Sequence, residues 1–199
     1  MKIEFRINLP HIYIQDAIYS IDFRLADSIP FEIYQKYSDL KRTIIRESKK
    51  HLLKNLYNDH IDSYLDNSSS LKDWLNKPLI RNEVASAIHY YDKVHYKLIA
   101  FCIMPNHVHL IINTNGFKPM PLGDFMGSIK RYSARKANIL LGREGKFWQT
   151  ESYDHILKSR NDLADSIDYV INNPVKAGLV AEWNEWPGTY LNEKYFDAK

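Results

Sequence analysis

The clearest alternation of apolar and polar residues lies in AIYSIDFRLADSIP, residues 17–30. Apolar side chains recur at every second position, and the polar residues between them are Ser20, Asp22 and Arg24. A period of two is typical of a β-strand with one buried face. The pattern therefore predicts a half-buried strand, which Pro30 ends.

The pattern changes to a helical period after this strand. From Phe31 to about Asp62, apolar residues recur at three- and four-residue steps, with many lysines and arginines between them. A polar loop, DNSSS at residues 66–70, follows, and WLNKPLI then leads into another short helix. These features predict a helical insertion around residues 31–75.

Two apolar runs, YKLIAFCI and HVHLIIN, flank the turn MPN at residues 104–106 and predict a β-hairpin. Side chains alternate along a strand, so His107 and His109 project from one face and Val108 from the other. Neutral imidazole is a common metal ligand, and two on one face could share an ion. The alternative is a half-buried sheet face on which the histidines meet solvent or hydrogen-bond partners. A third ligand is needed to favour the metal.

Two amphipathic helices are predicted beyond the hairpin. The first covers residues 121–142, with Gly142 as its C-cap, and the second covers residues 160–174, capped near Asn161 and stopped by Pro174. The segment between them, REGKFWQTESYDHIL, has no regular period. The order strand, helices, hairpin, helix, helix favours an α+β fold with an antiparallel sheet.

The last predicted helix carries a polar stripe beside its apolar face. Tyr169 and Asn173 lie one turn apart on this stripe, so a phenol and an amide oxygen could reach the same site. The alternative is that Tyr169 is a rim residue of an amphipathic helix and Asn173 a C-terminal cap. Spacing alone favours the alternative.

Composition fits one globular domain spanning residues 1–199, with an aromatic tail around residues 181–199 that packs back on the body. The single cysteine, Cys102, excludes a disulfide framework and a cysteine-rich zinc site. No segment approaches about 18 consecutive apolar residues, and the N-terminus lacks a signal-peptide pattern. We therefore expect a cytoplasmic protein. The net charge of +3 permits a nucleic-acid partner without demanding one.

A local excess of cations lies between Lys118 and Arg160, interleaved with aromatic residues. Cations follow phosphates and aromatic rings stack on unpaired bases, so the mixture suits single-stranded or hairpin nucleic acid. A solvated helix face would look similar. The candidate DNA contacts, drawn from this segment and from positions outside it, are Arg24, Lys130, Arg131, Arg135, Lys136, Lys146, Trp148 and Lys176.

Several of these motifs together resemble a known family. MPNHVHLII resembles the His-hydrophobic-His (HUH) signature of the single-tyrosine transposases. GREGKFWQTESYDHIL, followed by DYVINNPVKAGLV and the WNEWP tail, resembles the REP-associated tyrosine transposases, which are related to insertion-sequence enzymes that act on single-stranded DNA. IDFRLADSIP and WLNKPLI also match that branch, so the resemblance covers nearly the whole chain in order.

The resemblance implies an α+β, ferredoxin-like antiparallel sheet flanked by helices. It places Tyr169 at the nucleophile position, His107 and His109 at the metal-binding pair and Asn173 at a third, polar ligand. The implied ion is Mg²⁺ or Mn²⁺, although imidazole also accepts zinc. The implied activity is cleavage and rejoining of single-stranded DNA at hairpin (REP-like) elements through a 5′-phosphotyrosine. The partner is then hairpin DNA, the location is the nucleoid, and both a monomer and a homodimer are compatible with the resemblance.

Three other interpretations stay open. A histidine-triad nucleotide hydrolase needs a third alternating histidine, and this sequence has Ile111 there. A catalytically silent protein derived from a transposase would bind hairpin DNA without cutting it; the presence of all candidate catalytic residues favours activity instead. A purely structural domain leaves the co-occurrence of the histidine pair, the tyrosine helix and the basic aromatic segment unexplained.

Overall fold

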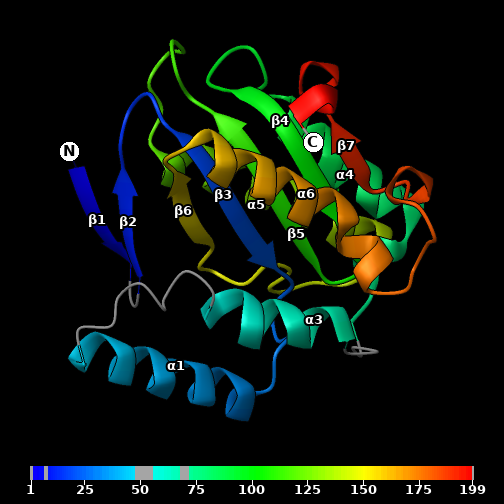
Figure 1. The fold of residues 1–199 in the computed structure, drawn as a ribbon. Coiled ribbons are helices and arrows are strands. Elements are labelled where there is room, and N and C mark those ends of the chain that lie inside the picture. Colours follow the sequence, from blue (N-terminus) through cyan, green and yellow to red (C-terminus); the bar gives the residue numbers. More distant parts are fainter. Residues whose placement is uncertain (1, 7–8, 48–55, 68–71, 199) are drawn as a thin grey trace.

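The structure is a computed structural model that describes residues 2–6, 9–47, 56–67 and 72–198. Its centre is a five-stranded antiparallel sheet with the strand order β6-β3-β5-β4-β7 (Figure 1). The strands are β3 (Ile18–Arg24), β4 (Lys97–Ile103), β5 (His107–Asn113), β6 (Tyr153–Leu157) and β7 (Thr189–Leu191). A separate two-stranded sheet pairs β1 (Lys2–Arg6) with β2 (Leu9–Tyr13).

The four strands from β3 to β6 give the sheet its ferredoxin-like topology. Side by side in the sheet they are ordered β6-β3-β5-β4. The last of the four along the chain therefore lies next to the first, and the third lies between the first and the second. Helices connect β3 to β4 and β5 to β6, whereas β4 and β5 form the hairpin predicted from the sequence. This is the βαββαβ pattern of the predicted fold class, which the structure confirms. β7 extends the sheet beyond β4.

Helices cover both faces of the sheet. α4 (Pro78–His89) and α5 (Leu122–Leu140) pack on one face, and α6 (Arg160–Lys176) crosses the other (Figure 1). The prediction that β3 is half-buried is wrong, because its polar residues Ser20, Asp22 and Arg24 are buried as well. That polar face becomes the floor of the site.

The segment between β3 and β4 includes a helical arm, defined as residues 31–47 and 56–67. It contains α1 (Phe31–Arg46), a short π-helical turn (Asn58–Asp62) and α3 (Ser63–Asn67). The described residues of the segment predicted to be helical, from Phe31 to about Asp62, are helical except at Glu47, where α1 has ended. Residues 48–55 lie outside the described residues. The predicted loop DNSSS is partly wrong, because Asp66 and Asn67 belong to α3; its serines lie outside the described residues.

The helical arm has a small core of its own. Its buried side chains are Tyr37, Leu56, Tyr57, Ile61 and Leu65, together with Ile29. Burying these side chains away from water is what holds the arm together beside the end of the sheet. A 3₁₀ turn (Trp74–Asn76) then leads into α4.

The end of the chain corrects two further predictions. β6, in the segment without a visible period, is a strand paired with β3. α6 begins after Ser159, whose hydroxyl accepts the Asp162 N–H at 3.0 Å, so the cap lies near Asn161, as predicted. Pro174 does not stop the helix, because it lies inside the last turn and the helix continues to Lys176.

Two predictions about helix and tail ends are confirmed. Gly142 directly follows the C-cap of α5 with φ near +60°, as a left-handed cap requires. The tail packs back through β7, flanked by 3₁₀ turns at Trp183–Glu185 and Glu193–Ala198. Among the described residues, no helix has the length and apolar character that crossing a membrane requires.

Candidate metal and nucleophile site

The two histidines lie side by side on β5, facing α6. The antiparallel register places Asp22 of β3 opposite His109. Both imidazoles are fully buried, and their Nε2 atoms are 2.8 Å apart. His109 Nδ1 is 2.6 Å from Asp22 Oδ1, and His107 Nδ1 is 2.6 Å from Asn106 Oδ1. Each ring is therefore held at Nδ1, with Nε2 turned toward a common point.

This arrangement has a direct electrostatic consequence. An Nδ1–H that donates to an oxygen leaves the Nε2 lone pair free in a neutral imidazole. Two such lone pairs 2.8 Å apart repel each other unless a proton or a metal cation lies between them. The geometry of His107 and His109 thus suits a bound cation.

α6 adds the two residues predicted from its polar stripe. The Asn173 amide nitrogen lies 3.1 Å from His109 Nε2, and its Oδ1 is buried without a hydrogen-bond partner. The Tyr169 ring, one turn earlier, meets the His109 ring edge to face at 5.6 Å between centroids. An amide's oxygen and nitrogen are interchangeable by rotation, so Asn173 can present oxygen to the same point. The structure brings His107, His109, Tyr169 and Asn173 together.

Two carboxylates from the helical arm join this site, and the sequence patterns did not single them out. The Tyr169 hydroxyl donates to Asp62 Oδ2 at 3.2 Å. Asp66 Oδ1 lies 3.5 Å from His107 Nε2. In the described part of the chain, two groups have the spacing of a metal site: Asp66 with His107 and His109, and Asp22 with Asp62 and His109. Spacing offered one signal, since Asp62 and Asp66 stand one helical turn apart.

Burial shifts the acid–base equilibria of these groups. Burial raises the pKa of Asp62 well above its usual range, and it raises the pKa of Asp66 to about 6. Burial also lowers the pKa of His107, which the charge of His109 lowers further. For His109 burial alone would lower the pKa, but the carboxylates, led by Asp22, raise it to about 9. Without metal, His109 therefore carries a proton, which marks the position where a cation is stabilised.

Burial likewise raises the pKa of the Tyr169 phenol above its ordinary value, and the charge of Asp62 raises it further. A phenol in these surroundings is a poor nucleophile without a proton acceptor or a nearby cation. The Asp62 carboxylate and the point between the histidines supply these two roles side by side. The donor set of imidazole nitrogens, an amide oxygen and a carboxylate suits a divalent ion.

The candidate DNA contacts fall into three positions. Lys176, on α6, holds its Nζ 4.4 Å from the centre of the Tyr169 ring, next to the site. Arg24 is buried near the end of β3 and bonds to Ser28. Arg131, Arg135, Lys136 and Lys146 lie on α5 or just after it, in the layer behind the sheet, so they are not part of the site.

Two of the remaining candidates have structural partners. Lys130 donates to the carbonyls of residues 149–151 and so anchors the segment before β6. Trp148 is buried, donates from Nε1 to Ser133 and packs against Phe23. Its ring therefore serves the core and has no open face for a base, which corrects the interpretation of Trp148 as a DNA contact.

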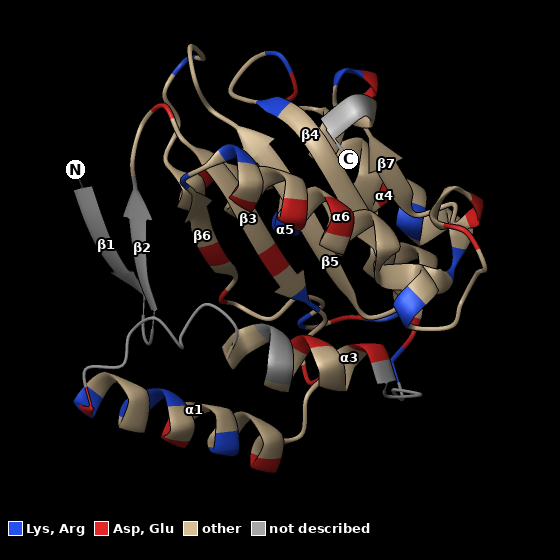
Figure 2. Ribbon diagram, in the orientation of Figure 1, with Lys and Arg blue, Asp and Glu red and all other residues tan. Residues whose placement is uncertain are grey.

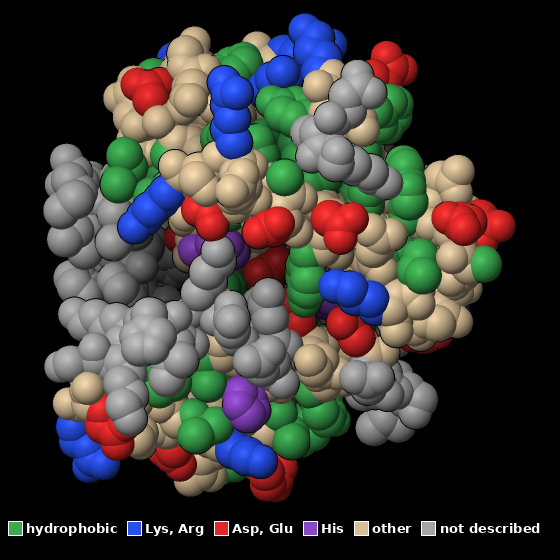
Figure 3. All heavy atoms as spheres, in the orientation of Figure 1, with side chains coloured by type: hydrophobic (Ala, Val, Ile, Leu, Met, Phe, Trp, Pro, Cys, Tyr) green, Lys and Arg blue, Asp and Glu red, His purple; other side chains and the backbone are tan. Residues whose placement is uncertain are grey.

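The outer surface of α6 is acidic. Figure 2 shows acidic positions along this helix, and Figure 3 shows carboxylates across the middle of the same face of the molecule. Asp165 and Asp168 are exposed there. An acidic surface of this kind repels anions such as phosphates.

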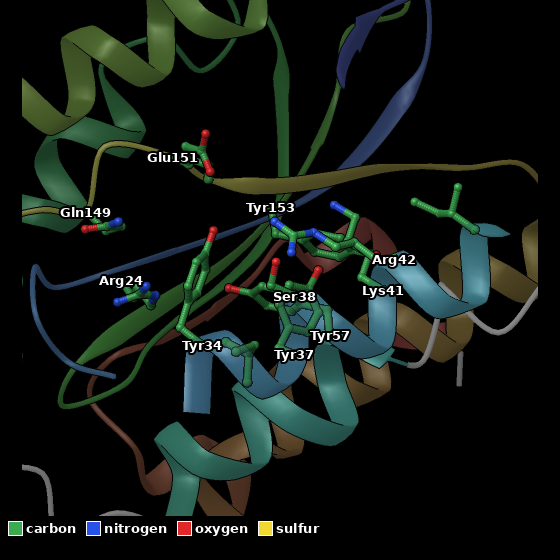
Figure 4. Close-up of a pocket in the computed structure, with 13 residues that line it drawn as sticks. Arg24, Tyr34, Tyr37, Ser38, Lys41, Arg42, Tyr57, Gln149, Glu151 and Tyr153 are labelled. Carbon is green, nitrogen blue, oxygen red and sulfur yellow. The ribbon is translucent and has the colours of Figure 1, made fainter. Parts of the chain in front are cut away.

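A cavity of about 190 Å³ opens between the helical arm and the segment that ends in β6 (Figure 4). Its walls carry four tyrosines and three cations, namely Tyr34, Tyr37, Tyr57, Tyr153, Arg24, Lys41 and Arg42. Tyr57 and Tyr153 stack with centroids 4.1 Å apart. The cavity adjoins the site, because Ile61 lines it and the next residue, Asp62, bonds to Tyr169.

Comparison with known proteins shows the family of this chain. Residues 69–173 match the family described as Transposase IS200 like. The chain belongs to this family. The match includes both histidines, Tyr169 and Asn173, and it begins after Asp62 and Asp66 of the helical arm.

Two related proteins and one solved structure are similar to this chain. An Escherichia coli REP-associated tyrosine transposase is 26% identical over 92 residues, which are 46% of this chain and 52% of that protein. A Haemophilus influenzae protein named "Putative REP-associated tyrosine transposase" is 25% identical over 130 residues, which are 60% of this chain and 69% of that protein. A solved structure of a REP-associated tyrosine transposase bound to a REP hairpin has the same fold, with a TM-score of 0.53 and 15% identity, over 98% of this chain and 82% of that one.

Proposed function

We propose that this protein is a metal-dependent, single-stranded DNA transposase that cuts and rejoins DNA at hairpin elements through a 5′-phosphotyrosine. One observation carries the proposal: the Tyr169 ring packs on His109 at the point where His107, His109 and Asn173 turn their donor atoms toward one another. A nucleophile beside a cation site is what phosphoryl transfer needs.

In this proposal, His107, His109 and Asn173 would bind the metal. A divalent ion there, Mg²⁺ or Mn²⁺, supplies positive charge that neutralises the charge developing on the scissile phosphate. The protein's part is orientation: Asp22 holds the His109 ring and Asn106 the His107 ring, each at Nδ1. Such outer partners fix the tautomer and the direction of the ligand nitrogen.

Tyr169 performs the chemistry. Its oxygen attacks phosphorus, a Tyr–O–P bond forms and the P–O3′ bond breaks, so the 5′ side stays on the enzyme and the 3′ side leaves. The phenol proton passes to Asp62, whose Oδ2 already accepts it in a hydrogen bond. The departing 3′ oxygen takes up a proton from solvent. A second 3′-hydroxyl can later attack the phosphotyrosine, which restores the tyrosine without ATP.

Hairpin DNA is the proposed substrate. A relative with the same fold is named as bound to a REP hairpin. The cavity beside Asp62, with its tyrosines and cations, supports binding of unpaired nucleotides next to the cut, because aromatic faces stack on bases and cations attract phosphates. Lys176 adds a positive charge beside Tyr169, with its Nζ 4.4 Å from the centre of the ring.

The test is covalent capture. The full chain is incubated with Mn²⁺ and a labelled single-stranded oligonucleotide that contains a foldable hairpin, and adducts are resolved on a denaturing gel. We expect an adduct that Tyr169→Phe abolishes and that the exposed control Tyr90→Phe retains. Tight hairpin binding without an adduct under any metal would establish the silent hairpin-binding protein instead.

The same assay tests a homodimer that shares its sites. Tyr169→Phe and His107→Ala chains are each inactive alone in this proposal. If a tyrosine acts on the metal site of a second copy, mixing the two variants restores an adduct. If each chain uses its own site, the mixture stays inactive.

A further inference from the structure

The donor atoms of the sheet and α6 already have the spacing of ligands around one ion. The two Nε2 atoms of His107 and His109 are 2.8 Å apart, and the Asn173 amide is 3.1 Å from His109 Nε2. Ligands 2.1 Å from a metal lie about 3.0 Å apart along an octahedral edge and about 3.4 Å apart along a tetrahedral edge. Two of the distances among these three groups are thus close to an octahedral edge.

Asp66 adds a donor atom from the helical arm. Its Oδ1 lies 3.5 Å from His107 Nε2, close to the tetrahedral edge length, and it is buried without a hydrogen-bond partner. Asn173 Oδ1 is also buried and without a partner. Two buried oxygens without partners, beside the facing Nε2 atoms of His107 and His109, indicate that the missing partner is a cation.

The hydrogen bonds of Asn106 fix the position of the backbone next to Asp66. Asn106 accepts from His107 Nδ1 through its Oδ1 and donates from its Nδ2 to the carbonyl of Leu65 at 3.1 Å. One side chain therefore positions both the His107 ring and the backbone immediately before Asp66. The hydrogen bond between Asn106 and Leu65 thus joins the arm to the start of β5 directly beside Asp66.

The second acidic group near the histidines fits a metal less well. It joins Asp22 and Asp62 to His109, but Asp22 occupies Nδ1 of that ring at 2.6 Å. A metal there would have to replace this hydrogen bond. Asp62 accepts from the Tyr169 hydroxyl through Oδ2, and its other oxygen, Oδ1, is buried without a hydrogen-bond partner on the Nδ1 side of the ring. The Nε2 side, with Asp66, is the side left for an ion.

We propose that Asp66 of the helical arm is a fourth protein ligand of the divalent ion held by His107, His109 and Asn173. This inference rests on the metal site of the proposed function and adds to it a ligand that lies before the family match at residues 69–173. A carboxylate brings a negative charge and a hard oxygen, which Mg²⁺ and Mn²⁺ prefer. The arm thereby selects a hard ion where two imidazoles alone would favour zinc.

The experiment measures Mn²⁺ affinity without DNA, from the free-ion signal in electron paramagnetic resonance. We compare the full-length wild type with Asp66→Asn, a change that keeps the size of the side chain, and with the exposed control Asp73→Asn. We expect Asp66→Asn to weaken Mn²⁺ binding by about tenfold or more, and Asp73→Asn to leave it unchanged. Zn²⁺ affinity should fall less than Mn²⁺ affinity, because the imidazoles remain.

Two further variants make each outcome decisive. Asp66→Glu keeps the charge and should bind Mn²⁺ more tightly than Asp66→Asn. Equal Mn²⁺ affinities of the wild type, Asp66→Asn and Asp66→Glu would overturn the assignment of Asp66 as a ligand. His107→Ala tests the site itself. If His107→Ala loses Mn²⁺ while Asp66→Asn binds like the wild type, the proposed metal site stands and only the fourth ligand is wrong. If His107→Ala also binds like the wild type, the metal site of the proposed function is wrong as well.

Discussion

The site is assembled from two regions that differ in how they are held. The sheet side consists of β3, β5 and α6, which share a hydrogen-bonded register and a common core and supply Asp22, His109 and Tyr169. The helical arm has its own small core and supplies Asp62 and Asp66. In the proposed function the sheet side supplies three metal ligands and the nucleophile, whereas the arm supplies a proton acceptor, Asp62, and one further ligand, Asp66. The difference suggests that the sheet sets whether chemistry occurs and the arm sets its rate and selectivity.

The largest effect is expected on the sheet side. His109→Ala removes a central donor and leaves the buried Asp22 carboxylate without its partner. We expect adduct formation in Mn²⁺ to fall about 10³-fold, as for loss of a main electrostatic group in other active sites. His89→Ala, an exposed histidine of α4, is the control. Single-turnover cleavage measures both, and near-normal cleavage by His109→Ala would remove the sheet side from the chemistry.

The pH dependence of stability should also belong to the sheet side. The folded pKa of His109 is about 9, above its ordinary value of 6.5, so the stabilisation is complete below pH 6.5 and is lost as the pH rises through 9. For the metal-free protein this loss amounts to at most about 3 kcal/mol in the free energy of unfolding. Urea titrations between pH 6 and 10 should show the decline, and Asp22→Asn should flatten it. An unchanged slope in Asp22→Asn would contradict the pairing.

On the arm, Asp62→Asn should slow chemistry without removing it. The amide keeps the size of the side chain but cannot take the Tyr169 proton. Loss of a general base costs about 10²-fold or more in rate. We expect adduct formation at saturating Mn²⁺ to slow by about that factor, with hairpin affinity unchanged in a gel-shift assay. A wild-type rate would show that the proton leaves by another route.

The smallest effect is expected in the cavity of the arm. Tyr34 lines it and is partly exposed, so Tyr34→Ala removes an aromatic face with little loss of core. Stacking of one base contributes about 1–3 kcal/mol, which corresponds to tenfold or more in Kd. We expect weaker binding of hairpins that carry an unpaired flank and no change for blunt hairpins. Tyr90→Ala, exposed on α4, is the control, and equal loss for both hairpins would exclude a base-binding cavity.

The arm was also the region that sequence patterns described least well. Asp66 was assigned to a loop but belongs to α3, and the helical pattern that reached Asp62 did not reveal that α1 ends at Arg46. Helical periodicity cannot locate such breaks when the polar positions continue through them. By contrast, the hairpin at residues 104–106 and the strand from Ile18 were visible, because a period of two persists for a whole strand.

The sequence by itself determined the relations that act within one element. Alternation put His107 and His109 on one face of a strand, and helical spacing put Tyr169 and Asn173 one turn apart, since both periods are local properties of the backbone. Only the tertiary structure decided that Asp22, 87 residues before His109, holds that ring, and that the arm brings both Asp62 and Asp66 close to His109. Those contacts depend on strand register and on packing between distant segments, which no local period encodes.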